Sequence, residues 1–316
     1  MSSAKNTILI SDAVGLVGAF IITELVSIIG KDATPENLEI RAGYHTETEL
    51  ANALANPPHP SYVKPCLTKW KDVASLETAM QGCTTLFLLT PFTCAVVAQR
   101  KVWVDLAIRL GVKHILHAGI HNGELPASDI PAHEEWNRQS EQYIESQSQH
   151  LTWTHLRINF DGYNGVVSIG KIQYFLPAAL KCGWIAREDI AAVAARVLLA
   201  PADHAGKRYR LSTESLSLED MAAIASEVVD KPIPAVSLKP EQFFSMATSA
   251  LANPDNDDQY VEYMKSVQSM FQGLSEGLYI YHLEAYPEVV EQVCQRPFLS
   301  FRQWLTNSPH KAKLLQ

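Results

Sequence analysis

Histidines gather in the middle of this 316-residue chain, around the ends of two predicted strands. His117 and His121 lie in the stretch HILHAGIHNGE, and His133 lies in the helical segment that follows. A neutral imidazole suits proton transfer near pH 7 and accelerates a reaction roughly 10²–10⁴-fold where it is well positioned. We therefore predict acid or base roles for His121 and His133, against the alternative that they are ordinary loop histidines. His117 is expected to be buried within its strand.

Other side chains near these histidines could also bind a small molecule or an ion. Four polar residues are expected at the same edge of the sheet: Glu134, Asn159, Asp161 and Tyr163. A metal site is not expected, because the chain has no HxH or HExxH spacing. The five cysteines lie far apart, and their odd number argues against a framework of disulfides.

A second candidate site is the turn in ILISDAVGLVG, residues 8–18, which joins a short apolar run to an amphipathic segment. Gly15 and Gly18 supply positions where a backbone can approach a phosphate at the start of a helix. Asp12 stands where such turns usually have their first glycine, and its carboxylate would repel a pyrophosphate by about 1 kcal/mol in water and more at lower dielectric. It could instead accept a hydrogen bond from a ribose hydroxyl. The alternative is an ordinary strand-to-helix turn.

These residues must be positioned by alternating strands and helices in the first half of the chain. Short apolar runs without strict alternation predict buried parallel strands at 7–11, 38–44, 61–67, 84–90, 114–118 and 151–158. Helical patterns lie between them at 18–29, 46–55, 75–81, 96–110 and 132–146. The alternation predicts an α/β fold with a doubly wound parallel sheet of the Rossmann type.

The alternation breaks down after about residue 160. Helices are expected at 188–199 and 217–229, a short strand at 209–211, and a helical region at 241–270 that a polar loop at 253–258 interrupts. Ser217, with Asp220 three residues on, resembles a capping box. We expect a Rossmann-type domain at 1–160 and a smaller, mostly helical substrate domain at 161–316, interleaved with the first and closing over the carboxyl edge of the sheet.

Bulk properties exclude several classes of partner. The formal charge is −8, and no stripe of Lys and Arg would attract nucleic acid. No window approaches the roughly 18 apolar residues of a membrane span. The beginning of the chain, MSSAKNTILIS, does not read as a signal or transit peptide, so a cytoplasmic protein is expected.

Several stretches, taken together and in order, resemble the NmrA-like branch of the atypical short-chain dehydrogenases/reductases. Besides the glycine turn they are LFLLTP at 86–91, GVKHIL at 111–116, LTWTHLRINF at 151–160, EDIAAVAARVL at 188–198 and GKRYRLS at 206–212. The resemblance implies a dinucleotide-binding domain, usually for NADP(H), and a small substrate domain. It implies either reduction of a small molecule or a regulatory role that senses the dinucleotide.

The chain departs from the family pattern at the positions that hold the cofactor and the reaction centre. His45 takes the place of the arginine that pairs with the 2′-phosphate, and this still favours NADP over NAD. Gly119 aligns with the usual serine, and Asn137 aligns with the lysine of the Tyr-x-x-x-Lys pair, so it can bond a ribose but brings no charge. The cofactor-binding residues implied are Asp12, Gly15, Leu16, Val17, Gly18, His45, Thr90 and Pro91.

The catalytic candidates are His133, His121 and Asn137, and four aromatic residues are expected to contact a flat aromatic substrate: Trp136, Phe160, Tyr163 and Trp184. Three functions remain open. The first is an NADP(H)-dependent oxidoreductase of a small carbonyl or aromatic metabolite. The second is a cofactor-independent isomerase, cyclase, lyase or hydrolase that uses the histidines. The third is a non-catalytic dinucleotide sensor with a protein partner. Monomer and homodimer are equally open.

Overall fold

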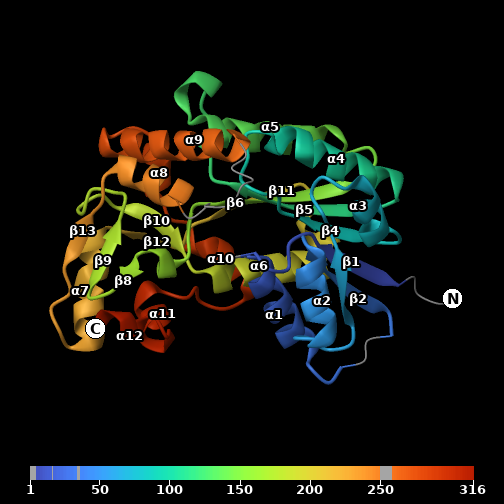
Figure 1. Cartoon of the computed structure of the whole chain (residues 1–316), viewed down its shortest axis with the longest axis horizontal. Coiled ribbons are helices and arrows are strands. Elements are labelled where there is room, and N and C mark those ends of the chain that lie inside the picture. Colours follow the sequence, from blue (N-terminus) through green and yellow to red (C-terminus); the bar gives the residue numbers. More distant parts are fainter. Residues whose placement is uncertain (1–4, 16, 34–35, 250–257) are drawn as a thin grey trace.

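A seven-stranded parallel sheet forms the centre of the computed structural model, which describes residues 5–15, 17–33, 36–249 and 258–316 (Figure 1). The strands lie in the order β11-β6-β5-β4-β1-β2-β3. Their bounds are β1 Asn6–Ile10, β2 Leu38–Tyr44, β3 Val63–Leu67, β4 Thr85–Leu88, β5 His114–Ile120, β6 Thr152–Ile158 and β11 Lys207–Leu211. The order reverses direction between β1 and β4, where ligands of open α/β sheets bind.

Helices cover both faces of this sheet and bury its strands. They are α1 Gly18–Ile29, α2 Glu47–Ala55, α3 Val73–Met80, α4 Val96–Arg109, α5 Ala132–Ser146 and α6 Arg187–Leu199. Helices α1 and α6 pack on one face and α3, α4 and α5 on the other (Figure 1). Ile8, Leu9 and Ile10 are all fully buried because successive side chains of β1 meet helices on alternate faces.

The predicted doubly wound sheet is confirmed, with element ends that differ by at most two residues. Helices α1 and α5 have the predicted bounds, and β5 runs two residues further than expected, to Ile120. Strand β4 ends at Leu88 rather than at residue 90. Strand ends are the harder prediction because the polar groups of the last residues can bond to the loops instead.

The second half contains more strands than its sequence pattern indicates. Two three-stranded sheets, β12-β10-β7 and β13-β9-β8, accompany its helices. The strands are β7 Phe160–Asp161, β8 Val167–Ser168, β9 Lys171–Tyr174, β10 Cys182–Ile185, β12 Glu214–Leu216 and β13 Ala235–Ser237. Strands of two to four residues are too short to show a periodicity, which explains why they were not predicted.

The remaining helices form the rest of this half. They are α7 Leu218–Val229, α8 Pro240–Ser249, α9 Asp258–Ser275, α10 Pro287–Cys294, α11 Phe301–Asn307 and α12 Lys311–Leu314, with the short 3₁₀ helices η1 Ala127–Asp129, η2 Tyr163–Gly165, η3 Pro201–His204 and η4 Ile280–Leu283. Ser217 caps α7 and forms the predicted capping box with Asp220. The polar loop predicted at 253–258 lies outside the described residues except for Asp258, which begins α9.

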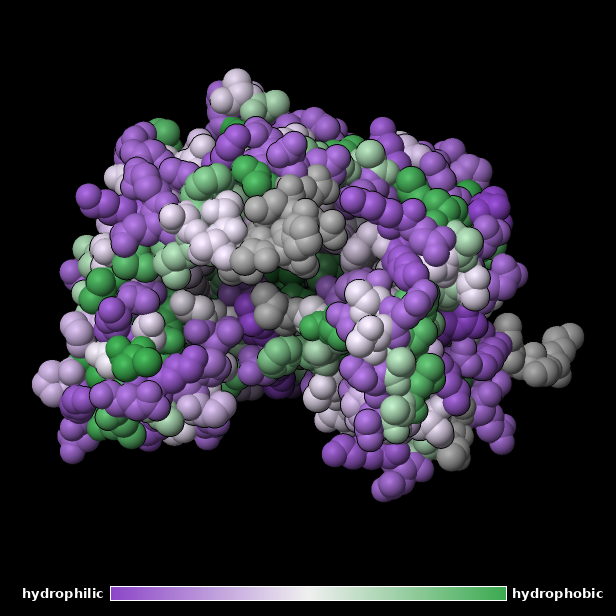
Figure 2. Space-filling view, viewed as in Figure 1, coloured by the Kyte–Doolittle hydropathy of each residue, from purple (hydrophilic) through white to green (hydrophobic). Residues whose placement is uncertain are grey.

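The two halves of the chain share the central sheet. Strand β11, from the second half, pairs with β6 at the sheet edge, and α6 packs against α1. These two elements therefore link the two halves of the chain. The surface is hollowed between the part that carries α11 and α12 and the part that carries α1 and α2 (Figure 2). None of the described helices combines the length and apolar character that crossing a membrane requires.

Candidate active site

A cavity of about 320 Å³ lies where the carboxyl ends of β5 and β6 meet α8 and α9. Its volume is at the lower end of the range for small-molecule sites. Residues from both halves of the chain line it: Phe92, Ile120, His121, His133, Ile158, Asn159, Phe160, Asp161, Tyr174, Phe243, Ala247, Tyr260, Tyr263, Met264, Val267, Met270, Phe271 and His282.

Aromatic rings form the apolar wall of this cavity. Phe271 of α9 lies 5.0 Å from the ring of Phe243 and 5.7 Å from that of Tyr174. Phe160, the first residue of β7, completes the wall at 6.2 Å from Phe271. Tilted and edge-on rings at these distances make a rigid apolar surface that suits a flat ligand.

The four residues predicted to contact an aromatic substrate lie in three different environments. Phe160 lines the cavity, and Trp184 is buried behind it at 5.1 Å. Tyr163 is fully buried among the side chains of α11 and donates to Glu214 Oε2 at 2.8 Å. Trp136 packs beside Tyr263, a cavity residue, at 6.0 Å. Trp184 and Tyr163 are therefore parts of the core that hold the wall in place.

His133 lines the cavity with its ring held by Ser266. Its backbone N–H donates to Ser266 Oγ at 2.9 Å, and its Nδ1 lies 2.9 Å from the same oxygen. A hydroxyl both donates and accepts, so this contact positions the ring with either tautomer. Burial, followed by the charge of His282, lowers the pKa of His133 to about 3. His133 is thus a neutral imidazole near pH 7.

His121, at the end of β5, offers the complementary group. Its Nε2 lies 3.2 Å from the carbonyl oxygen of Tyr281, so Nε2 carries the proton and Nδ1 is an acceptor. Burial, and then the charge of His282, lowers its pKa to about 3. Together the two histidines give the cavity two neutral imidazoles whose charge does not change with pH above about 5.

A third histidine, His282 of η4, also lines the cavity, and sequence reasoning missed it. Its Nδ1 lies 2.7 Å from Asn159 Oδ1 and its Nε2 lies 2.9 Å from Glu134 Oε1. Tyr281 donates to the other oxygen of Glu134 at 2.8 Å. His282 stands 148 positions after Glu134, in a helical turn too short for a sequence pattern, so no local signal could have paired them. Glu134 and Asn159 were expected at this edge.

Asn137 is fully engaged by neighbouring protein groups. Its Oδ1 accepts from Arg100 Nη1 at 2.7 Å, and its Nδ2 donates to the carbonyl of His133 at 2.8 Å. Arg100 Nε also donates to Thr90 Oγ1 at 3.0 Å. The guanidinium is buried, and burial lowers its pKa to about 10. A cation therefore lies beside Asn137, and it comes from α4.

The predicted phosphate-binding turn lies at the same edge of the sheet, after β1, but Asp12 closes it. Asp12 Oδ1 accepts from the backbone N–H of Gly15 at 2.7 Å and of Val14 at 3.2 Å. A Cβ at Gly15 would lie 2.0 Å from Asp12 Oδ2, and one at Gly18 would lie 1.6 Å from the carbonyl oxygen of Asp12. The carboxylate thus accepts the hydrogen bonds of the N–H groups that a phosphate would otherwise bind.

His45 pairs with this carboxylate from the end of β2. Its Nε2 lies 3.1 Å from Asp12 Oδ1, and its ring lies 4.3 Å from that of Trp70 at a tilt of 33°. Burial alone would lower the pKa of His45, but the hydrogen bond and charge of Asp12 outweigh it and raise the pKa. Arg41 points elsewhere, because its guanidinium bonds Glu39 and the carbonyl oxygens at the end of α3.

The remaining predicted cofactor residues lie around this turn. Val17 precedes α1 and is buried, and Thr90 and Pro91 lie between β4 and Phe92 of the cavity. Leu16 lies outside the described residues. The carboxyl edge of the sheet thus runs from the turn, past β4, to the cavity.

Residues 4–295 match the NmrA-like family. The chain belongs to that family. An NAD(P)H azoreductase of Xenophilus azovorans is 27% identical over 179 residues, which are 54% of this chain and 60% of that protein. The chain thus spans less than two thirds of that relative's length.

Two solved structures have the same fold as this NmrA-like chain. The triphenylmethane reductase of Citrobacter sp., complexed with NADP(H), superposes with a TM-score of 0.68 at 18% identity and covers 98% of this chain and 99% of its own. An NADPH-dependent quinone oxidoreductase of Escherichia coli has a TM-score of 0.65 at 21% identity and covers 95% and 98%.

A dinucleotide phosphate would need the N–H groups of Val14 and Gly15, which the Asp12 carboxylate occupies in this structure. The same carboxylate is the partner of His45. The glycines leave room for the approach, since neither carries a side chain. The Asp12 carboxylate and a phosphate therefore compete for the same two donors.

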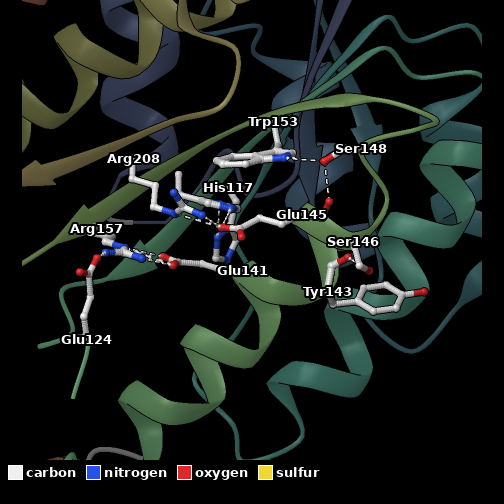
Figure 3. A network of polar contacts seen from close by, with 11 residues as sticks. His117, Glu124, Glu141, Tyr143, Glu145, Ser146, Ser148, Trp153, Arg157 and Arg208 are labelled. Carbon is white, nitrogen blue, oxygen red and sulfur yellow. Dashed lines mark hydrogen bonds and ion pairs between the residues drawn. The ribbon is translucent and has the colours of Figure 1, made fainter. Parts of the chain in front are cut away.

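A buried polar network joins β5, β6 and α5 (Figure 3). His117 Nδ1 lies 3.2 Å from His155 Nδ1 across neighbouring strands, and Arg157 holds Glu141 through three contacts of 2.8–3.2 Å. As expected, His117 is buried. In the described part of the chain, His117, His155 and Glu141 are the one group that could hold a metal ion, with ligand atoms within 4.8 Å. Because Arg157 already neutralises Glu141, we interpret them as a structural network.

Proposed function

We propose that the chain is an NADP(H)-dependent oxidoreductase of a small, flat aromatic or carbonyl compound. The observation that carries this proposal is the aromatic cavity with its two neutral histidines, on the same sheet edge as the glycine turn. The relatives named azoreductase, quinone oxidoreductase and triphenylmethane reductase support this chemistry. Their names do not fix the substrate of this chain.

The dinucleotide would lie along the carboxyl edge of the sheet. The backbone of Gly15, Val17 and Gly18 would hold the pyrophosphate, and Thr90 and Pro91 would border the middle of the cofactor. His45, released from Asp12, would face the 2′-phosphate as a cation, because its pKa is raised in the pair and a phosphate would replace the carboxylate. When bound, the nicotinamide supplies or accepts the hydride.

The chain's own residues would orient the substrate. The ring of His133 would hydrogen-bond one polar atom of the substrate, and His121 Nδ1 would accept from a hydroxyl group. These roles replace the acid and base roles expected from sequence, because a group with a pKa of about 3 binds few protons near pH 7. Asn137 would act through its neighbours, since both ends of its amide are already bonded.

A specific observation also favours the second function, a cofactor-independent enzyme on the same fold. The Asp12 carboxylate takes the two N–H donors and carries the charge that a pyrophosphate would carry. If it never leaves, the cavity histidines would have to act on a substrate without hydride transfer. An isomerase, cyclase, lyase or hydrolase would then be the reaction class.

Titration calorimetry with NADPH and NADH, beside melting scans with each nucleotide, tests the proposal. We expect micromolar binding, tighter for NADPH. A screen of quinones and azo compounds that follows NADPH absorbance would then identify the substrate. No binding at millimolar nucleotide would overturn the oxidoreductase and leave the cofactor-independent enzyme.

A further inference from the structure

The hydrogen-bonding role of His121 is set by the group that its ring contacts. Its Nε2 lies 3.2 Å from the backbone carbonyl oxygen of Tyr281, and a carbonyl oxygen only accepts hydrogen bonds. Burial, and then the charge of His282, lowers the pKa of His121 to about 3, so the ring carries a single proton near pH 7. That proton lies on Nε2, and Nδ1 keeps a lone pair that can accept.

This Nδ1 atom belongs to the accessible part of the cavity wall. In the described part of the chain no protein group hydrogen-bonds it, and the atom is not buried from solvent. His121 as a whole is only 2% exposed, and its ring lines the cavity. Nδ1 is therefore an acceptor that faces the cavity without a partner from the protein.

The other polar groups of the described wall are already paired or can adapt. Asp161 is an acceptor as well, but its carboxylate is paired at 3.1 Å with an arginine that does not line the cavity. Both ends of the Asn159 amide bond to His282. Tyrosine hydroxyls and the ring of His133 can donate or accept. His121 Nδ1 differs from them in having a fixed role and no protein partner.

We propose that the cavity selects planar aromatic ligands that donate a hydrogen bond, namely un-ionised phenols and aromatic amines. The O–H or N–H group donates to His121 Nδ1, and the rings of Phe160, Phe243 and Phe271 contact the planar body. This inference rests on the cavity being the substrate site of the proposed function, but it does not require a nucleotide to bind. Substrates of the proposed oxidoreductase would then carry a hydroxyl or amino group on the aromatic ring.

Two kinds of ligand are disfavoured by this arrangement. A ligand without a donor removes water from His121 Nδ1 and leaves this acceptor unpaired, which weakens binding. A phenolate cannot donate either, and its charge would enter an apolar wall whose charged groups are already paired.

Three compounds of nearly the same shape test the inference, because they differ only in the group at one end: 4-nitrophenol, 4-nitroaniline and 4-nitrotoluene. Calorimetry without nucleotide, in mildly acidic buffer that keeps the phenol neutral, would compare their dissociation constants. We expect the phenol and the aniline to bind at least about tenfold more tightly than the toluene. Apolar burial alone predicts the opposite order, since the methyl group is the most hydrophobic of the three.

The colour change of 4-nitrophenol on ionisation tests the preference for the un-ionised form. Its absorbance would be titrated against pH with saturating protein and without nucleotide. The bound phenol should ionise at a pH higher by about 1 or more than the free phenol, a tenfold preference for the neutral form.

The variant His121→Phe keeps an aromatic ring but removes the acceptor, so it should reduce the preference for 4-nitrophenol over 4-nitrotoluene to less than about twofold. The matched control His150→Phe, at an exposed position before β6, should keep the preference. If His121→Phe does not fold, the wild-type measurements still decide.

Binding of 4-nitrotoluene as tight as that of 4-nitrophenol would overturn the inference. So would a bound phenol that ionises at the same or a lower pH than the free phenol, an unchanged preference in folded His121→Phe, or no binding of the three compounds at millimolar concentration. Because no nucleotide is present, failure to bind NADPH would count against the proposed oxidoreductase alone.

Discussion

At the residue scale, Asp12 decides whether this NmrA-like chain uses its glycine turn. Its carboxylate accepts from two backbone N–H groups and pairs with His45, so these donors of the turn are already hydrogen-bonded within the chain. A phosphate must compete with a ligand that is already attached to the chain. One side chain therefore separates the two candidate functions.

Replacing Asp12 should strengthen NADPH binding. Asp12→Gly frees both N–H groups and removes the negative charge, and we expect Kd to fall at least tenfold, about 1.4 kcal/mol. Asp12→Asn keeps the shape of the side chain and its hydrogen-bonding oxygen, so it separates the effect of charge from that of occupancy. Calorimetry on the three proteins measures both. Equal affinity of all three proteins for NADPH would show that Asp12 does not control nucleotide binding.

His45 should make stability depend on pH through the same pair. The pKa of His45 is raised in the folded state. Its contribution to the free energy of unfolding is therefore fully present below about pH 6.5, the ordinary pKa of histidine, and disappears as the pH rises through the raised pKa. Wild type should exceed His45→Gln in free energy of unfolding by up to about 1 kcal/mol at low pH and by nothing at pH about 9. Urea unfolding at several pH values provides the measurement. A difference that grows with pH would contradict the pairing.

The cavity histidines should be needed for turnover and not for stability. His133→Ala or His121→Ala should lower turnover about 100-fold, because each removes a fixed hydrogen-bonding group, with a nearly unchanged melting temperature. Since both pKa values are about 3, ionisation of these histidines should not change the turnover rate between about pH 5 and 8. Unaltered turnover in both variants would show that the histidines are not part of the site.

At the scale of elements, the site is built where strands end and helices begin. Strand β5 delivers His121, β6 delivers Asn159, and α5 delivers His133 from its first turn. Because the sheet is parallel, these ends meet at one edge. Helix α9 then covers the edge and supplies Ser266, which holds the ring of His133 in place. The same geometry brings α1 against the turn.

Gly18→Ala should disrupt the contact of α1 with the turn. Its Cβ would lie 1.6 Å from a backbone oxygen of Asp12, so the helix or the turn must move. We expect a loss of about 2 kcal/mol or more in stability, with weaker nucleotide binding. Gly165→Ala is the matched control, because its Cβ would meet the nearest atom at 3.9 Å. Equal stability of both variants in thermal unfolding would contradict this packing.

At the scale of the whole molecule, the two halves of the chain are joined too closely to unfold separately. Strand β11 completes the sheet, and Asp189 of α6 accepts from the backbone N–H of Leu299 at 2.7 Å and contacts Arg296 at 2.8 Å. These contacts tie the segment before α11 to the sheet. The division into a Rossmann-type domain at 1–160 and a substrate domain at 161–316 stays a prediction.

Unfolding should therefore be a single transition. Tryptophan fluorescence and far-ultraviolet circular dichroism should give coincident unfolding curves. Asp189→Ala should shift both curves to lower urea concentration and lower the free energy of unfolding by about 2–3 kcal/mol, because it leaves a backbone donor unpaired. Asp32→Ala, at an exposed position, should change neither. Two separate transitions in the wild-type protein would show that the halves are independent.

The order of strands and helices, the parallel sheet, the exact bounds of α1 and α5 and the position of the glycine turn could all be predicted from sequence, because hydrophobic periodicity and turn residues act locally. So could the presence of His121, His133 and Asn159 at the carboxyl edge, since that edge is fixed by chain direction. The pairing of His282 with Glu134, the closure of the turn by Asp12 and His45, and the burial of Tyr163 and Trp184 behind the wall were decided by the tertiary structure. Those outcomes depend on contacts between distant segments, on the orientation of side chains and on burial, which no local pattern encodes.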